Sequence, residues 1–262
     1  MADLVSLMAY LQHGPPSLPI IEPEQSPQNT HNDGYSADDI ETVGHWQGFS
    51  LASLLQQYGG LLATVQIMDE PFQRSPPRPI NSERALRSRI DAYLTNRIIR
   101  ALRQGFAYMS STRPLAGFFT VLNFDVGAMA ATSDDDSPHF AFFDPNLDAQ
   151  TRPNRVPGGA KPSYEWSLDF RNHPNPQFRR EFFQALSQAN FYMKQHHTRY
   201  SFIITDREFV AIRRLDRDGN LELSTSIPWT ARGSSSQPRM TVLLAIWYLG
   251  MLAADDQNWY LA

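Results

Sequence analysis

The feature that most constrains the fold of this 262-residue chain is the order of hydrophobic patterns after residue 81. Apolar side chains recur at helical spacing from Leu86 to Leu102, behind a capping residue at Asn81 or Ser82, and Gly105 is expected to end this helix. Three strand patterns, a second long helix, a strand pair, a hairpin and a last helix follow. This alternation predicts an α/β core with a mixed sheet flanked by helices.

The expected elements have definite ranges. Strands are expected at Phe118–Phe124, at His139–Phe143, around Val156 and Lys161–Trp166, at Tyr200–Thr205, at Glu208–Arg214 and at Leu221–Ser224; helices are expected at 178–193 and 240–254. Asp218-Gly219 is a typical hairpin turn, and 128–137 is expected to be a loop.

The region before this core has a different composition. Residues 1–44 predict a short apolar helix and a flexible segment rich in Pro, Asn and Gln. Residues 45–80 predict a helical extension, broken at Gly59-Gly60, and a Pro-rich linker. The sequence therefore indicates an N-terminal helical and Pro-rich extension, followed by one domain over 81–262.

Composition excludes several classes of function. The net charge of −4 gives the chain no overall attraction to nucleic acid or to an anionic membrane. Binding of either partner would need a local basic patch on the surface. The absence of Cys excludes disulfides and thiolate chemistry. The start of the chain lacks a basic segment typical of signal peptides, and the longest apolar run, 240–254, is too short to span a bilayer. We expect an intracellular protein, cytoplasmic or nuclear, with no membrane partner.

One cationic residue is unusual. Of the 23 Lys and Arg residues only two are Lys, and Lys161 follows an expected strand in the segment Val156-Pro-Gly-Gly-Ala-Lys161. Asp144 lies seventeen residues earlier, at the end of another expected strand. The frame of an Asp, a gap and then acid-x-Lys is typical of metal-dependent nucleases of the PD-(D/E)XK type. Gly159 stands where the second acid of that frame belongs.

A wider resemblance supports this frame. Residues 80–262 resemble a group of uncharacterised fungal proteins with a PD-(D/E)XK nuclease-like (restriction-endonuclease-like) core. The resemblance is carried by the segments Gly158–Trp166, Phe182–His196, Arg199–Arg214 and Ile227–Trp229, and by the helix around 243–250. It implies the core order of helix, three strands, helix and strand.

The resemblance also implies roles for three residues. Asp144 corresponds to the first metal carboxylate, Glu83 to a helix acid that reaches the metal, and Lys161 to the motif Lys that assists the attacking water. The implied cofactor is Mg²⁺ or Mn²⁺, which would neutralise charge developing on a phosphodiester. Asp144-Pro145 inverts the usual Pro-Asp order. Glu165 is not expected to replace the acid missing at 159, because four residues of extended strand would place it about 13 Å from Lys161.

Three hypotheses follow. The first is a nuclease-like protein with an eroded metal site which, if active, hydrolyses phosphodiesters with Asp144 and Glu83 as ligands and Lys161 assisting the water. The second is a non-catalytic binding or scaffold protein on a degenerate nuclease fold, favoured by Gly159. The third is an enzyme acting on a small organic molecule in the reused cleft, near Tyr164 and Trp166.

Other polar patterns have simpler explanations. The Arg-rich helix 84–103 could contact the phosphates of a nucleic acid, although a solvated helix face explains the same pattern. Gln184, Gln188 and Gln195 are expected on a helix surface. His196-His197 is expected to interact with a helix C-terminus rather than with a metal.

Overall fold

The computed structural model describes residues 3–21, 29, 33–73, 77–112, 118–131 and 137–262, so parts of the expected N-terminal segment, the Pro-rich linker and the 128–137 loop lie outside the described residues. Its centre is an eight-stranded sheet in the order β2-β9-β8-β7-β6-β5-β4, with β10 paired to β8. The strands are β2 (Thr42–His45), β4 (Asn123–Val126), β5 (Phe140–Phe143), β6 (Gly158–Ala160), β7 (Tyr200–Ile204), β8 (Glu208–Arg214), β9 (Asn220–Leu223) and β10 (Ile227–Pro228).

The sheet is mixed. β6 pairs in parallel with β7, and β2 with β9, whereas the other neighbours are antiparallel. A separate antiparallel pair joins β1 (Leu4–Ser6) to β3 (Gln66–Met68). The helices are α1 (Leu7–Leu11), α2 (Leu51–Thr64), α3 (Glu83–Ile90), α4 (Asn96–Thr112), α5 (Pro176–Gln195) and α6 (Val242–Ala254), with a π-helix at Asp91–Thr95 and 3-10 turns at Ala37–Asp39, Gly127–Met129 and Leu168–Asn172. The predicted α/β class, with a mixed sheet flanked by helices, is confirmed.

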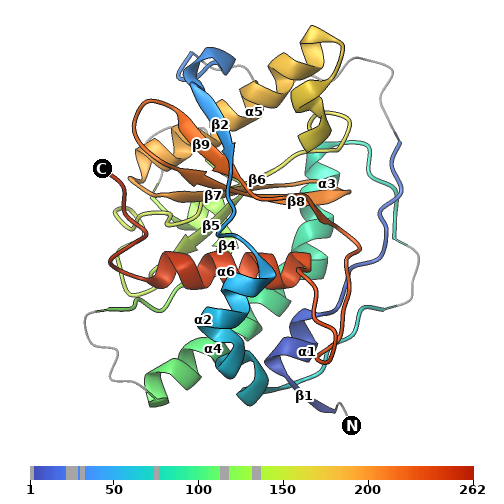
Figure 1. Ribbon diagram of the computed structural model, residues 1–262, viewed down its shortest axis with the longest axis vertical. Coiled ribbons are helices and arrows are strands. Elements are labelled where there is room, and N and C mark those ends of the chain that lie inside the picture. Colours follow the sequence, from blue (N-terminus) through green and yellow to red (C-terminus); the bar gives the residue numbers. More distant parts are fainter. Residues whose placement is uncertain (1–2, 22–28, 30–32, 74–76, 113–117, 132–136) are drawn as a thin grey trace.

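Helices cover both faces of this sheet (Figure 1). On one face α2, α4 and α6 pack against strand side chains such as Phe202 and Ile204. On the other face α5 packs against Ile203, Val210 and Ile212. The alternation within β7 and β8 therefore divides the core into two layers. Helix α6 is buried at every position except Leu252, which explains why its sequence is apolar on all sides.

The first core helix is longer than expected. It runs through α3, the π-helix and α4 to Thr112, so the expected end at Gly105 is wrong. A Cβ atom built on Gly105 would meet the Trp247 ring at 3.4 Å. Gly105 thus permits a close crossing of α4 and α6 instead of ending a helix.

Two strand predictions also differ from the structure. Lys161–Trp166 is not a strand, because β6 ends at Ala160 and the chain turns at Pro162, where Glu165 and Trp166 donate backbone hydrogen bonds to its carbonyl. The strand expected at Phe118–Phe124 begins only at Asn123. The strands at 140–143, 200–204 and 208–214 lie where the sequence predicts them.

The described part of the N-terminal region belongs to the same core as the rest. Leu7, Leu11 and Leu54 share one buried cluster with α4 and α6. Strand β2 joins the main sheet beside β9, and Ile20 forms a bridge with Ile80. The described residues before position 81 therefore pack against the same core and the same sheet as the residues after it. No helix in these residues is long and apolar enough to cross a membrane.

Gly158 provides a test of the sheet packing. A Cβ atom at this position would lie 2.1 Å from the Phe202 ring, whereas a Cβ atom at the exposed helical Gly60 would meet nothing within 4 Å. We expect Gly158→Ala to lower the free energy of unfolding by about 1–3 kcal/mol. Gly60→Ala should raise it by about 0.5–1 kcal/mol. Urea unfolding measures both, and a neutral Gly158→Ala variant would contradict this packing.

Candidate functional site

The candidate site lies where the start of α3 meets the end of β6. Ser82 caps α3 by accepting a hydrogen bond from the Ala85 backbone, and Glu83 is the first residue of the helix. One Glu83 carboxylate oxygen, Oε2, lies 3.6 Å from the Lys161 ammonium, and the other, Oε1, lies 3.0 Å from His139 Nε2. A helix N-terminus, a strand end and the residue before β5 therefore converge on one carboxylate.

The ring of His139 has a defined tautomer. Its Nδ1 accepts a hydrogen bond from the Ala160 backbone N–H at 2.8 Å, so the ring proton of the neutral imidazole resides on Nε2 and is donated to Glu83. Burial lowers the pKa of His139 despite the hydrogen bond to Glu83, which acts in the opposite direction. His139 is thus a neutral donor that links β6 to α3.

The Glu83 carboxyl is stabilised as an anion. Burial raises its pKa, but the His139 hydrogen bond and the positive charges of Lys161 and Arg87 outweigh this effect and leave the pKa below its usual value. Lys161 faces it from a buried position, with only 3% of its side chain exposed. The Lys161 backbone N–H donates to the Ile204 carbonyl, which extends the pairing of β6 with β7 to this residue.

Glu165 lies near this cluster because of the turn at Pro162. The Ser163 backbone N–H donates to the Asp206 carboxylate at 2.7 Å, and the buried Trp166 stacks on Phe182, which together fix the turn. Burial raises the pKa of the Glu165 carboxyl to about 7, with Lys161 acting in the opposite direction and Glu83 adding to the rise. The expected distance of about 13 Å between Glu165 and Lys161 is wrong, because β6 ends at Ala160 and the chain turns at Pro162 instead of continuing as a strand.

Asn29 connects the same turn to α5. Its side-chain amide donates to the Glu165 carbonyl at 3.2 Å and to the Glu181 carboxylate at 2.9 Å, and its backbone N–H donates to the same carboxylate oxygen of Glu181 at 2.8 Å. Glu181 is buried and adds to the rise of the Glu165 pKa. The N-terminal segment therefore contributes one residue to the surroundings of the site.

Asp144 lies elsewhere. β5 and β6 are antiparallel with Phe140 opposite Gly158, so Lys161 lies near the start of β5 and Asp144 lies past its end. Five residues of extended chain separate Asp144 from His139, which corresponds to about 17 Å. The Asp144 carboxylate accepts a hydrogen bond from the Asn146 backbone, as in a turn. The structure thus brings Glu83 and Lys161 together but not Asp144.

The residues assigned to Mg²⁺ or Mn²⁺ do not fit a divalent cation. Glu83 is engaged by His139 and by an ammonium group, and Asp144 is too distant to share an ion with it. Among the residues that the structure describes, no group of three or more His, Asp or Glu side chains could hold a metal ion. Gly159 adds no carboxylate, although a Cβ atom there would make only ordinary contacts, the closest at 3.9 Å.

The arginines of the first core helix have different roles. Arg97 and Arg100 both pair with Glu70, and Arg97 also donates to the Glu70 and Tyr93 carbonyls. They attach the segment after β3 to the helix, so they are not a continuous phosphate-binding face. Arg84, Arg87 and Arg103 are exposed, in keeping with a solvated face.

Two further expectations are wrong. Gln184 is buried rather than on the helix surface. His196 is buried at the C-terminal cap of α5, and burial lowers its pKa to about 4, so at neutral pH it has no charge to interact with the helix dipole.

His139 belongs to the site although no pattern of ligand spacing singles it out, and Glu165 lies in its surroundings although extended-strand spacing argues against this. Pro138-His139 precedes β5 and has the Pro-first order that Asp144-Pro145 inverts, so it was the available signal for a site residue at the start of that strand. Pro162-Ser163, directly after Lys161, signals a turn that would bring Glu165 back.

Comparisons with known proteins add nothing to this geometry. The chain matches no family model, and neither a curated protein nor a solved structure matches it.

The buried ammonium predicts unequal effects of the two partners. Glu83→Ala leaves Lys161 and the His139 Nε2–H without their acceptor, so we expect it to lower the free energy of unfolding by about 2 kcal/mol. Lys161→Met keeps the volume and removes the buried charge, and its effect should stay within about 1 kcal/mol. Adding Lys161→Met to Glu83→Ala should recover part of the loss. Urea unfolding of the three variants checks this, and equal effects of the two single substitutions would contradict it.

The raised pKa of Glu165 predicts a pH dependence of stability. The folded state keeps this proton up to about pH 7, whereas the unfolded state releases it near the usual value of 4.5. The contribution of Glu165 to stability should therefore be lost as pH rises from about 4.5 to about 7. The free energy of unfolding of wild type minus that of Glu165→Gln, measured with urea, should fall across this pH window. The same difference for Glu41→Gln, a substitution at an exposed position, is the control. A difference for Glu165→Gln that is flat across the window would contradict the prediction.

Proposed function

We propose that this chain is a non-catalytic binding or scaffold protein built on a fold that resembles the PD-(D/E)XK nucleases. The observation that carries the proposal is the internal satisfaction of Glu83 by His139 and Lys161. In a metal nuclease the same region presents carboxylates to a cation. Here a neutral imidazole and an ammonium group engage the one acid of α3, and Gly159 stands where the frame has its second acid.

The element order supports the resemblance. The helix α3–α4 precedes three antiparallel strands, β4, β5 and β6, and α5 then connects β6 to the parallel strand β7. This is the order of helix, three strands, helix and strand that the sequence suggests. The fold is therefore compatible with descent from a nuclease whose metal ligands were replaced.

Electrostatics also disfavours retained metal chemistry. The Lys161 ammonium lies 3.6 Å from the Glu83 carboxylate, so a divalent cation bound to Glu83 would be repelled by it. Replacing the cation with a fixed internal charge stabilises the anionic Glu83 without a ligand. The cluster then joins α3 to the sheet instead of activating water.

A second candidate is proton transfer on a small organic molecule. The pKa of Glu165, about 7, suits a group that gives and takes protons near neutral pH, and Lys161 supplies a neighbouring positive charge. Glu165 would act as the acid or base, with Lys161 binding an anionic group of the substrate.

The test combines metal binding with nuclease activity. Lys161 follows Gly159 by two residues along the extended chain, so Gly159→Glu places a carboxylate on the same face, and His139→Asp places another at the start of β5. Wild type and Lys161→Ala should show no Mn²⁺ binding by calorimetry and no cleavage of DNA or RNA with Mg²⁺ or Mn²⁺. The double variant His139→Asp/Gly159→Glu should gain saturable Mn²⁺ binding. Wild-type cleavage that Lys161→Ala abolishes would refute the proposal.

A further inference from the structure

A second polar site lies between the first core helix and two described stretches that follow β3, residues 70–73 and 77–78. The cavity has a volume of about 410 Å³, within the range of small-molecule sites. It is lined by Glu70, Phe72, Gln73, Pro77, Arg78, Arg89, Ala92, Tyr93 and Arg97. None of these residues takes part in the Glu83 cluster.

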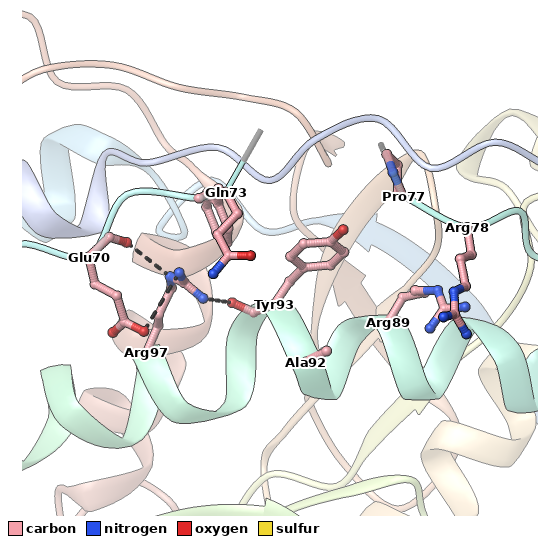
Figure 2. Close-up of a pocket in the computed structure, with 9 residues that line it drawn as sticks. Glu70, Gln73, Pro77, Arg78, Arg89, Ala92, Tyr93 and Arg97 are labelled. Carbon is pink, nitrogen blue, oxygen red and sulfur yellow. Dashed lines mark hydrogen bonds and ion pairs between the residues drawn. The ribbon is translucent and has the colours of Figure 1, made fainter. Parts of the chain in front are cut away.

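The charges of this cavity are unbalanced. Glu70 is the one acid among its lining residues, and it already pairs with Arg97 and Arg100. Within the described part of the chain neither Arg78 nor Arg89 has a carboxylate partner. Figure 2 shows their side chains approaching each other from the linker and from α3. Two adjacent cations without a counter-charge favour an anion between them.

Arg89 carries the strongest indication. Its Nε atom is buried and has no hydrogen-bond partner among the described atoms. A buried donor without an acceptor is costly, and a bound anion would supply one. The planar guanidinium groups of Arg78 and Arg89 match phosphate and carboxylate oxygens, which accept paired hydrogen bonds.

The neighbouring wall is aromatic. The rings of Tyr93 and Phe72 meet edge to face with centroids 5.9 Å apart, and Arg97 stacks over Phe72 at 4.2 Å. Ala92 and Tyr93 belong to the π-helix, a geometry that often marks functional positions. In Figure 2, Tyr93 lies along the helix between Arg97 and Arg89. An apolar ring can therefore lie against Tyr93 while its anionic group meets the two arginines.

We propose that this cavity binds a small aromatic compound bearing a phosphate or carboxylate group. A nucleic-acid backbone fits less well. Arg97 and Arg100 form ion pairs with Glu70, so the arginines along the helix do not make a continuous row of unpaired positive charges. The proposal is independent of the chemistry at Glu83. Either one can fail without the other.

The experiment is calorimetric titration of the full chain with phenyl phosphate. Wild type should bind one equivalent, and phenol, which lacks the anion, should not bind. Arg78→Gln/Arg89→Gln should weaken binding about tenfold or more. The matched control Arg84→Gln/Arg103→Gln removes the same charge from exposed positions of the same helix and should stay within about twofold.

A second variant tests whether the loss of binding in Arg78→Gln/Arg89→Gln comes from the cavity rather than from misfolding. Ala92→Phe fills the cavity without changing its charge, and it should also abolish binding of phenyl phosphate. Benzoate titrated in parallel distinguishes a carboxylate site from a phosphate site, and binding of either compound that depends on Arg89 supports the proposal. No saturable binding of either compound by wild type, or equal weakening by the two double variants, would overturn it. Tighter binding of a single-stranded oligonucleotide that persists in Arg78→Gln/Arg89→Gln would overturn it as well.

Discussion

The arrangement of α3 against the sheet depends on one carboxylate. Glu83 accepts a hydrogen bond from His139 and pairs with a Lys161 side chain that is almost fully buried. Burying an ammonium group without a paired anion destabilises the folded state. The burial of Lys161 therefore depends on α3 placing Glu83 beside it. The same interaction leaves no carboxylate oxygen of Glu83 unengaged for a metal ion. The two contacts that hold α3 on the sheet therefore also engage both oxygens of this carboxylate.

Much of the fold could be predicted from local patterns. Helix α5, helix α6 and the β7–β8 pair follow directly from periodicity, because each has a strong apolar face and clear ends. The errors arise where tertiary packing overrides a local signal. Gly105 looks like a helix end but serves a close contact with Trp247. The N-terminal strands β1 and β2 have almost no pattern of their own, because distant partners determine their pairing.

The site was half predictable. Glu83 and Lys161 were identified, and they do lie together. The frame of an Asp followed by acid-x-Lys points to Asp144, whereas the antiparallel register places the start of β5, with His139, beside Lys161. The spacing between Lys161 and Glu165 suggests a large distance only for an extended chain, whereas the chain turns at Pro162. Such errors follow from one-dimensional spacing, which contains no information about which end of a strand meets which neighbour.

If His139 and Lys161 rather than a metal ion engage Glu83, the imidazole of His139 has a fixed tautomer that can be measured. Nitrogen-15 NMR of the histidine ring reports which nitrogen carries the proton. We expect a neutral ring protonated at Nε2 at pH 7, with Nδ1 accepting from the Ala160 N–H, and the same signals with and without millimolar Mg²⁺. A ring that is doubly protonated at pH 7, or whose Nε2 signal shifts on addition of Mg²⁺, would contradict it.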